Sequence, residues 1–131
     1  MQSTDSGSTL LAQFLQGIAE VDCDAIQRIS DADISLSIPG AGDVTLTQTS
    51  IGPAAVCDWA KTVKEKCGKI IFKIEKCIEV DGDVMAVGSM TIDDYPQLFN
   101  SRMAIHIRFM HGTISAFELF FDTHALSQFR W

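Results

Sequence analysis

The chain has 131 residues, of which 47% are apolar and 21% are charged, a composition typical of a folded globular protein rather than a disordered one. Its formal net charge of -7 at pH 7 argues against a nucleic-acid partner, because phosphate groups would be repelled. No apolar run approaches the roughly 18–20 residues of a membrane span, and the first residues do not resemble a signal peptide. We therefore expect no membrane partner and a cytoplasmic location.

The first part of the chain predicts three helices. Residues 1–9 are expected to form a polar tail before a single domain over residues 10–131, with the first helix running from about Ser8 to Val21. Its apolar residues repeat at the spacing of one buried helical face. Asp22 is the expected cap of a short second helix over residues 24–30. A third helix opens at Gly52–Pro53 and stops at Gly68.

The remaining pattern predicts strands. Residues 34–38 alternate apolar and serine side chains, which indicates a strand with one buried face, and residues 44–49 form a weak strand or extended loop. After residue 68 we expect an antiparallel meander of four strands with a loop over residues 93–100. The strand over residues 69–80 should bury Ile70, Phe72, Ile74 and Ile78. The fold class is therefore α+β, with helices packed on one face of a curved sheet.

The cysteines give no sign of a metal or redox site. Cys23, Cys57, Cys67 and Cys77 form no C-x-x-C pair, so we expect no metal and no cofactor. Cys57 and Cys67 would lie about 15 Å apart on the third helix at 1.5 Å per residue, too far for a disulfide. We expect reduced, mostly buried thiols.

Four short motifs resemble those of one superfamily. They are Val21–Ile26 after the first helix, Asp31–Ile34 at the first strand, Ile51–Gly52 before the third helix, and His111–Ile114 followed by Phe120–Asp122. Their order resembles the nuclear transport factor 2-like superfamily, which includes ketosteroid isomerases and polyketide cyclases, over about residues 8–129. The resemblance implies a cystatin-like cone, and a homodimer formed through the outer sheet face. It does not by itself imply a reaction.

The resemblance also locates where an isomerase would carry its functional groups. The tyrosine that holds the enolate oxygen falls at Phe14, the carboxylate base at Ile38, and the protonated aspartic acid at Ile105. None of these side chains can donate or accept the required proton. We therefore expect the isomerase mechanism to be absent.

Two interpretations of the cone interior are open. In the first, an apolar pocket accepts a small hydrophobic molecule; in the second, the same side chains meet and fill the space. The expected lining residues are Phe14, Ile18, Ile38, Trp59, Met90, Met103, Ile105, Phe117 and Phe121.

Three polar residues are weak catalytic candidates: His106, Glu118 and Asp122. A three-residue hairpin loop over residues 110–112 would pair residue 106 with residue 116 and place Glu118 on the outer face beside His106 and Arg108. That cluster is either an acid–base site or a set of cross-strand pairs at a dimer contact. A two-residue loop would shift the register by one and turn Glu118 into the cone.

Asp122 just follows the last strand and is either an acid at the site or a cap for the C-terminal turn. The sequence thus leaves three functions open: a protein that binds a small hydrophobic molecule, a non-catalytic homodimerisation module, or a lyase- or isomerase-type enzyme that uses Asp122 or Glu118.

Overall fold

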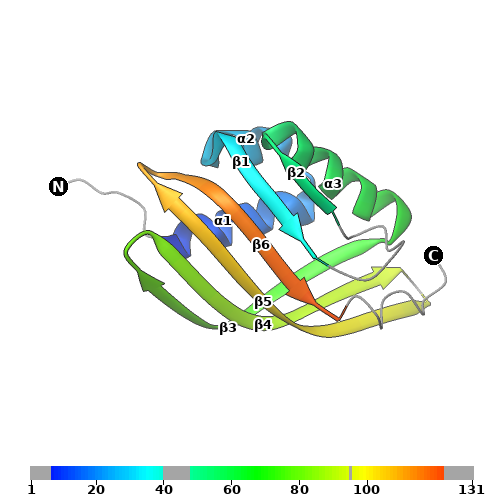
Figure 1. The fold of residues 1–131 in the computed structure, drawn as a ribbon. Coiled ribbons are helices and arrows are strands. Elements are labelled where there is room, and N and C mark those ends of the chain that lie inside the picture. The colour runs from blue at the N-terminus through cyan, green and yellow to red at the C-terminus, as the bar shows by residue number, and fades with distance from the viewer. Residues whose placement is uncertain (1–6, 40–47, 95, 123–131) are drawn as a thin grey trace.

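The computed structural model describes residues 7–39, 48–94 and 96–122. Three helices pack along one face of a six-stranded, strongly curved sheet with the strand order β2-β1-β6-β5-β4-β3 (Figure 1). β1 runs parallel to β6, and all other neighbours are antiparallel. The elements are α1 (Gly7–Glu20), α2 (Cys23–Ile29), β1 (Ser30–Ile38), β2 (Gln48–Ile51), α3 (Pro53–Lys66), β3 (Lys69–Val80), β4 (Asp83–Asp94), β5 (Gln97–Met110) and β6 (Thr113–Phe121). The predicted α+β class is confirmed.

The helix boundaries follow the expected signals closely. The carboxylate of Asp22 accepts a hydrogen bond from the Ala25 N–H over 3.1 Å, which caps α2 as predicted. The left-handed Gly68 N–H donates to the Val63 carbonyl and closes α3. α1 begins at Gly7, one residue before the predicted start at Ser8. None of the described helices combines the length and apolar character needed to cross a membrane.

The loop expected over residues 93–100 is wrong. β4 continues to Asp94 and β5 starts at Gln97, with Asp93 paired to Leu98 and Asp94 paired to Gln97. Phe99 is buried opposite Ile92, because this segment alternates between the two faces of the sheet, with Leu98 and Asn100 exposed. The paired aspartates and Pro96 in this stretch are typical of a loop and gave no indication of the strand pairing.

β3 changes face halfway along its length. Ile74 pairs with Gly88 and Lys76 pairs with Val87, so Glu75 is the extra residue of a β-bulge. Every side chain of β3 after the bulge therefore points to the face opposite to the one expected from simple alternation. Ile78, which we expected to be buried, lies on the outer face and is 65% exposed.

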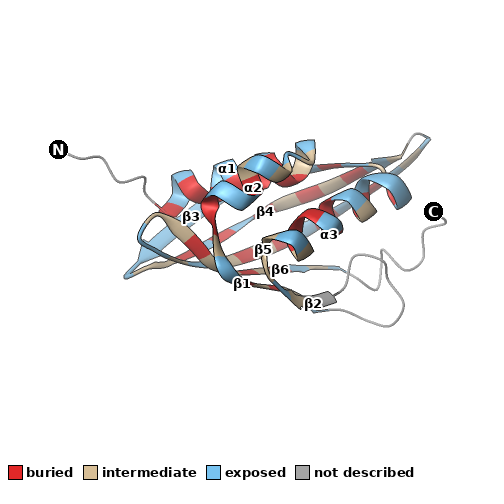
Figure 2. Cartoon of the chain, turned by 90° about the horizontal axis from the view of Figure 1, so that it is seen from above, coloured by how far each residue is buried: buried red, intermediate tan, exposed pale blue. Residues whose placement is uncertain are grey.

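The hydrophobic core lies between the helices and the concave face of the sheet. Buried positions recur along β1, β4, β5 and β6 (Figure 2). Phe14 of α1 and Phe117 of β6 meet at the centre with ring centroids 5.0 Å apart. The part of the cone that the structure describes is thus lined by aromatic and aliphatic side chains.

Candidate functional site

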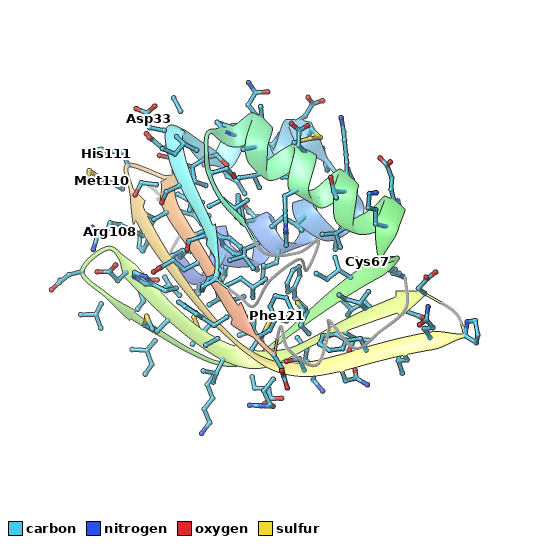
Figure 3. The ribbon with its side chains drawn as sticks, turned by 45° about the vertical axis from the view of Figure 1, so that its right-hand side comes forward. Asp33, Cys67, Arg108, Met110, His111 and Phe121 are labelled. Carbon is cyan, nitrogen blue, oxygen red and sulfur yellow. A yellow bond between two sulfur atoms is a disulfide. The ribbon has the colours of Figure 1, made fainter. Side chains whose placement is uncertain are left out.

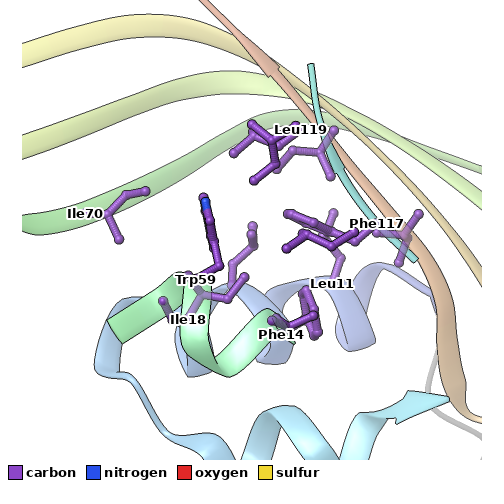
Figure 4. Packing of buried hydrophobic residues seen from close by; sticks show 14 of the residues in the cluster. Leu11, Phe14, Ile18, Trp59, Ile70, Phe117 and Leu119 are labelled. Carbon is purple, nitrogen blue, oxygen red and sulfur yellow. The ribbon is translucent and has the colours of Figure 1, made fainter. Parts of the chain in front are cut away.

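The nine residues predicted to line the cone come together from six elements. Eight of them are buried, and Phe121 is partly buried and packs against the same core. Figure 4 shows Phe14, Ile18 and Trp59 from the helices in one cluster with Phe117 and Leu119 from the sheet. Phe121 packs edge-on to Phe99, with ring centroids 6.3 Å apart. The predicted set therefore occupies one region of the molecule between the two layers.

The polar groups of the described core are few and already paired. Ser30 and Ser101 are its buried polar residues. The Ser30 hydroxyl donates to the Ile26 carbonyl over 2.6 Å, and the Ser101 hydroxyl donates to the Arg102 carbonyl over 2.7 Å. Among the described residues, no buried side-chain nitrogen or oxygen lacks a partner. The described interior therefore offers apolar contact rather than proton transfer.

A charged cluster lies on the opposite, outer face of the sheet. His106 of β5 places Nδ1 2.7 Å from Glu118 Oε1 on β6 and Nε2 2.8 Å from Asp83 Oδ1 on β4. Arg108 adds a longer contact, 3.4 Å from its Nε to the same Asp83 oxygen. His106 thus joins three neighbouring strands through two carboxylates.

This geometry favours the charged form of the imidazole. Both carboxylates are acceptors, so both ring nitrogens must carry a proton for the two hydrogen bonds to form together. The hydrogen bonds to Glu118 and then to Asp83 raise the pKa of His106, whereas the hydrogen bond from His106, with help from Arg108, lowers the pKa of Asp83. The outer-face cluster is therefore an ionic network at acidic to neutral pH.

The hairpin between β5 and β6 has a different loop from the one expected. Met110 pairs with Thr113, so the loop has two residues, His111 and Gly112, and both have positive φ angles of 55° and 79°. Such a loop fits the right-handed twist of a hairpin. Figure 3 shows Arg108, Met110 and His111 in succession toward the tip of this hairpin.

A second irregularity restores the side-chain facing that the shorter loop alone would have reversed. Arg108 pairs with Ala116 but Phe109 pairs with Ile114, so Ser115 is an extra residue in β6. His106 therefore pairs with Glu118 instead of residue 116. The expected register is wrong, but the predicted placement of Glu118 beside His106 on the outer face is confirmed. Glu118 does not turn into the cone.

Comparison with known proteins identifies the fold. The chain matches no protein-family model and no curated protein. It is similar to a solved protein of unknown function from Burkholderia pseudomallei, described as nuclear transport factor 2-like, with 16% identity over 91% of this chain and 92% of that chain and a TM-score of 0.79. The chain has the nuclear transport factor 2-like fold.

Two further solved structures share this fold with the chain. TerC, co-crystallised with polyporic acid, is 19% identical over 92% of this chain and 95% of that chain, with a TM-score of 0.81. An epoxide hydrolase of M. tuberculosis is 14% identical over 88% of this chain and 82% of that chain, with a TM-score of 0.73. At these identities the likeness establishes architecture and leaves the activity open.

Within the nuclear transport factor 2-like fold, the three positions that match isomerase groups are apolar and buried. Phe14, Ile38 and Ile105 are each at most 1% exposed. The third polar candidate, Asp122, is exposed, and its backbone N–H donates to the Ser101 hydroxyl over 2.9 Å. Whether Asp122 caps a C-terminal turn depends on residues 123–131, which lie outside the described residues.

The cysteines differ from the expectation. Cys23 at the start of α2 and Cys57 in α3 form a disulfide, with Cα atoms 5.5 Å apart, so the expectation of reduced thiols throughout is wrong. Sequence spacing gave no signal for this pair, because its members are 34 residues apart on different helices. Cys67 and Cys77 are free, and burial raises the pKa of Cys67 to about 11. In the described residues, no three His, Cys, Asp or Glu side chains gather in a way that could hold a metal ion.

Proposed function

We propose that the protein binds a small hydrophobic molecule within its cone and does not carry out ketosteroid isomerase chemistry. The observation that carries this proposal is the convergence of the predicted lining residues from six elements on one apolar interior. Apolar walls with few polar groups are typical of sites for hydrophobic ligands. The co-crystallisation of TerC, which has this fold, with polyporic acid lends support.

Tryptophan fluorescence tests this proposal. The chain has two tryptophans, so Trp131→Phe leaves the buried Trp59 as the single reporter. We expect flat aromatic and polycyclic compounds to quench Trp59 saturably. Met103→Ala, which changes the cone wall, should shift Kd several-fold, whereas the matched Met85→Ala on the outer face should leave Kd unchanged. Equal effects of the two methionine substitutions, or no saturable quenching by any compound, would contradict the proposal.

The second proposal is a homodimer formed through the outer sheet face. Ile78 pairs with Met85, and Ala104 lies between Val87 and Phe120, so exposed apolar side chains are continuous across β3 to β6. A contiguous exposed apolar patch is typical of a contact surface. The same patch supports the alternative function, a non-catalytic homodimerisation module.

Sedimentation of charge variants tests the dimer. Val87→Glu and Phe120→Glu should each shift the protein to monomer, because a carboxylate would be buried in the contact. Gln27→Glu adds the same charge on the helix layer and should leave the mass unchanged. A wild-type monomer at all concentrations would exclude this interface. A dimer that binds none of the quenching compounds would favour the dimerisation module.

The enzymatic alternative has weaker support. Glu118 is held on the outer face by His106, away from the apolar interior. Asp122 directly follows Phe121 in the chain, and Asp122→Asn would remove the activity of such an enzyme if Asp122 were its catalytic group. The cytoplasmic location expected from the sequence stays a prediction, which fractionation of cells expressing the protein would test.

A further inference from the structure

The Cys23–Cys57 disulfide lies under an open hollow in the helix layer. The hollow has a volume of ≈ 400 Å³ and is lined by both cysteines together with Gln27, Pro53, Ala54, Asp58 and Lys61. This volume falls within the range of roughly 300–1,000 Å³ that is usual for small-molecule sites. Both cysteines therefore border a space that is open to solvent and large enough for a small molecule.

The two sulfur atoms differ in their surroundings. Cys57 is 9% exposed and lies on the buried side of α3, whereas Cys23 is only partly buried at the start of α2. Thiol–disulfide exchange requires the attacking thiolate to approach one sulfur in line with the bond that breaks. Cys23 is the more exposed residue of the pair, so we expect an incoming thiolate to attack its sulfur.

We propose that this hollow is a thiol-exchange site for a small-molecule thiol. The incoming thiolate attacks Sγ of Cys23, a new S–S bond forms there, and the Cys23–Cys57 bond breaks. Cys57 leaves with the electron pair and takes a proton from water. A second thiol then displaces Cys23, so the protein disulfide gains two electrons and two protons while two thiols are oxidised to a disulfide.

The neighbours of Cys57 suit its role as the leaving group. Lys61 is four residues further along α3, on the same helical face, and its side chain lines the hollow. An ammonium group there stabilises the departing thiolate. Asp58 opposes this effect, so we expect Lys61 to change the exchange rate by a modest factor.

Exchange at this site would alter the wall of the cone. α3 carries the buried Trp59, two residues after Cys57, and the disulfide is the covalent link between α3 and α2. Breaking that link removes a restraint on the helix that covers the apolar interior. The exchange reaction itself does not depend on the ligand proposed for the cone.

Glutathione is the probe for this site. In a Cys67→Ala/Cys77→Ser background, native protein is incubated with reduced glutathione, quenched with acid and mapped by mass spectrometry without reduction. We expect glutathione on Cys23 with a free thiol on Cys57, formed at a rate that does not change with urea below the unfolding transition. Lys61→Gln should slow the reaction about two- to five-fold, and Lys66→Gln, on the opposite side of α3, should not.

Single-cysteine variants add a readout that does not depend on trapping the intermediate. With oxidised glutathione, Cys23 in the Cys57→Ser protein should form its adduct faster than Cys57 in the Cys23→Ser protein. Adducts mainly on Cys57 would overturn the proposal. So would a reaction whose rate rises in parallel with the unfolded fraction in urea, because exchange would then require global unfolding rather than the hollow.

Discussion

His106 is the residue whose protonation matters most on the described surface. Its side chain is 22% exposed, and each ring nitrogen faces a carboxylate on a neighbouring strand. When the ring is neutral, one nitrogen has no proton to donate, so one of the two contacts becomes a contact between two acceptors. The cluster therefore binds one proton more tightly in the folded state than in the unfolded chain.

This arrangement predicts a loss of stability at alkaline pH. Because folding raises the pKa of His106, its contribution to the free energy of unfolding is complete below about pH 6.5 and is lost as pH rises through the folded pKa. Between pH 6 and pH 9, the free energy of unfolding of the wild-type protein should fall by about 0.5–1 kcal/mol more than that of His106→Gln. Urea unfolding at each pH measures this difference.

His111 provides the control for this titration. It lies in the hairpin loop outside the cluster, so His111→Gln is the matched histidine substitution. Asp83 acts in the opposite direction: its lowered pKa adds stability above about pH 3.9 that is lost as pH falls through the folded value. Identical pH slopes for wild type and His106→Gln would show that the cluster does not couple protonation to folding.

The prediction of this cluster shows how far alternation can be read along a strand. Period-two alternation correctly placed His106 and Glu118 on the same face, but from a register that was wrong. A two-residue loop and the bulge at Ser115 each shift the register by one in the same direction, and a total shift of two residues leaves every side chain on its expected face. Neither shift has a clear signal in the sequence, because Ser115 has an ordinary strand neighbourhood.

At the scale of elements, the bend in β3 depends on a glycine in the next strand. Gly88 lies opposite Ile74, at the start of the bulge formed by Glu75. A methyl group at Gly88 would overlap the backbone carbonyl of Lys73, which cannot move without breaking the β3–β4 ladder. Arg102 holds the bulge from the other side, with Nη1 3.0 and 2.8 Å from the two carboxylate oxygens of Glu75.

Gly88→Ala should therefore destabilise the fold by about 2–4 kcal/mol, because the clash involves backbone rather than a flexible side chain. Gly112→Ala is a useful comparison, since its methyl group would meet open space but φ is 79°. Only the cost of the left-handed backbone applies there, about 1 kcal/mol. Urea unfolding of both variants measures the difference. A smaller loss for Gly88→Ala than for Gly112→Ala would show that the sheet relaxes at the bulge.

The sequence was more informative for helices than for this part of the sheet. The signals for helix ends are local, because each acts within about one helical turn. The predicted ends therefore agree with the structure at Asp22, Gly52–Pro53 and Gly68. The bulge in β3 and the β4–β5 connection depend on neighbouring strands. Ile78 and the loop over residues 93–100 were misplaced for that reason.

At the scale of the whole molecule, one layer of helices covers the concave face of the sheet and leaves the outer face open (Figure 1). The family resemblance, together with the apolar periodicity of α1, β1 and β5, predicted side chains that are buried between the layers, among them Phe14, Ile38 and Ile105. It was not enough to predict the disulfide, because the distance between α2 and α3 is set by how both pack on the sheet. The identity of a cone ligand is likewise not encoded by apolar lining residues alone.

The disulfide should contribute substantially to global stability. It closes a loop across a sequence separation of 34 residues, which in the chain-entropy estimate corresponds to about 3–4 kcal/mol. In the Cys67→Ala/Cys77→Ser background, replacing Cys23 and Cys57 with alanine should lower the free energy of urea unfolding by that amount. Chemical reduction of the unsubstituted pair should give a similar loss, because the unfolded chain is released in both cases. If alanine substitution lowered the free energy of unfolding but chemical reduction did not, the effect would come from packing of Cys57 and not from the covalent link between α2 and α3.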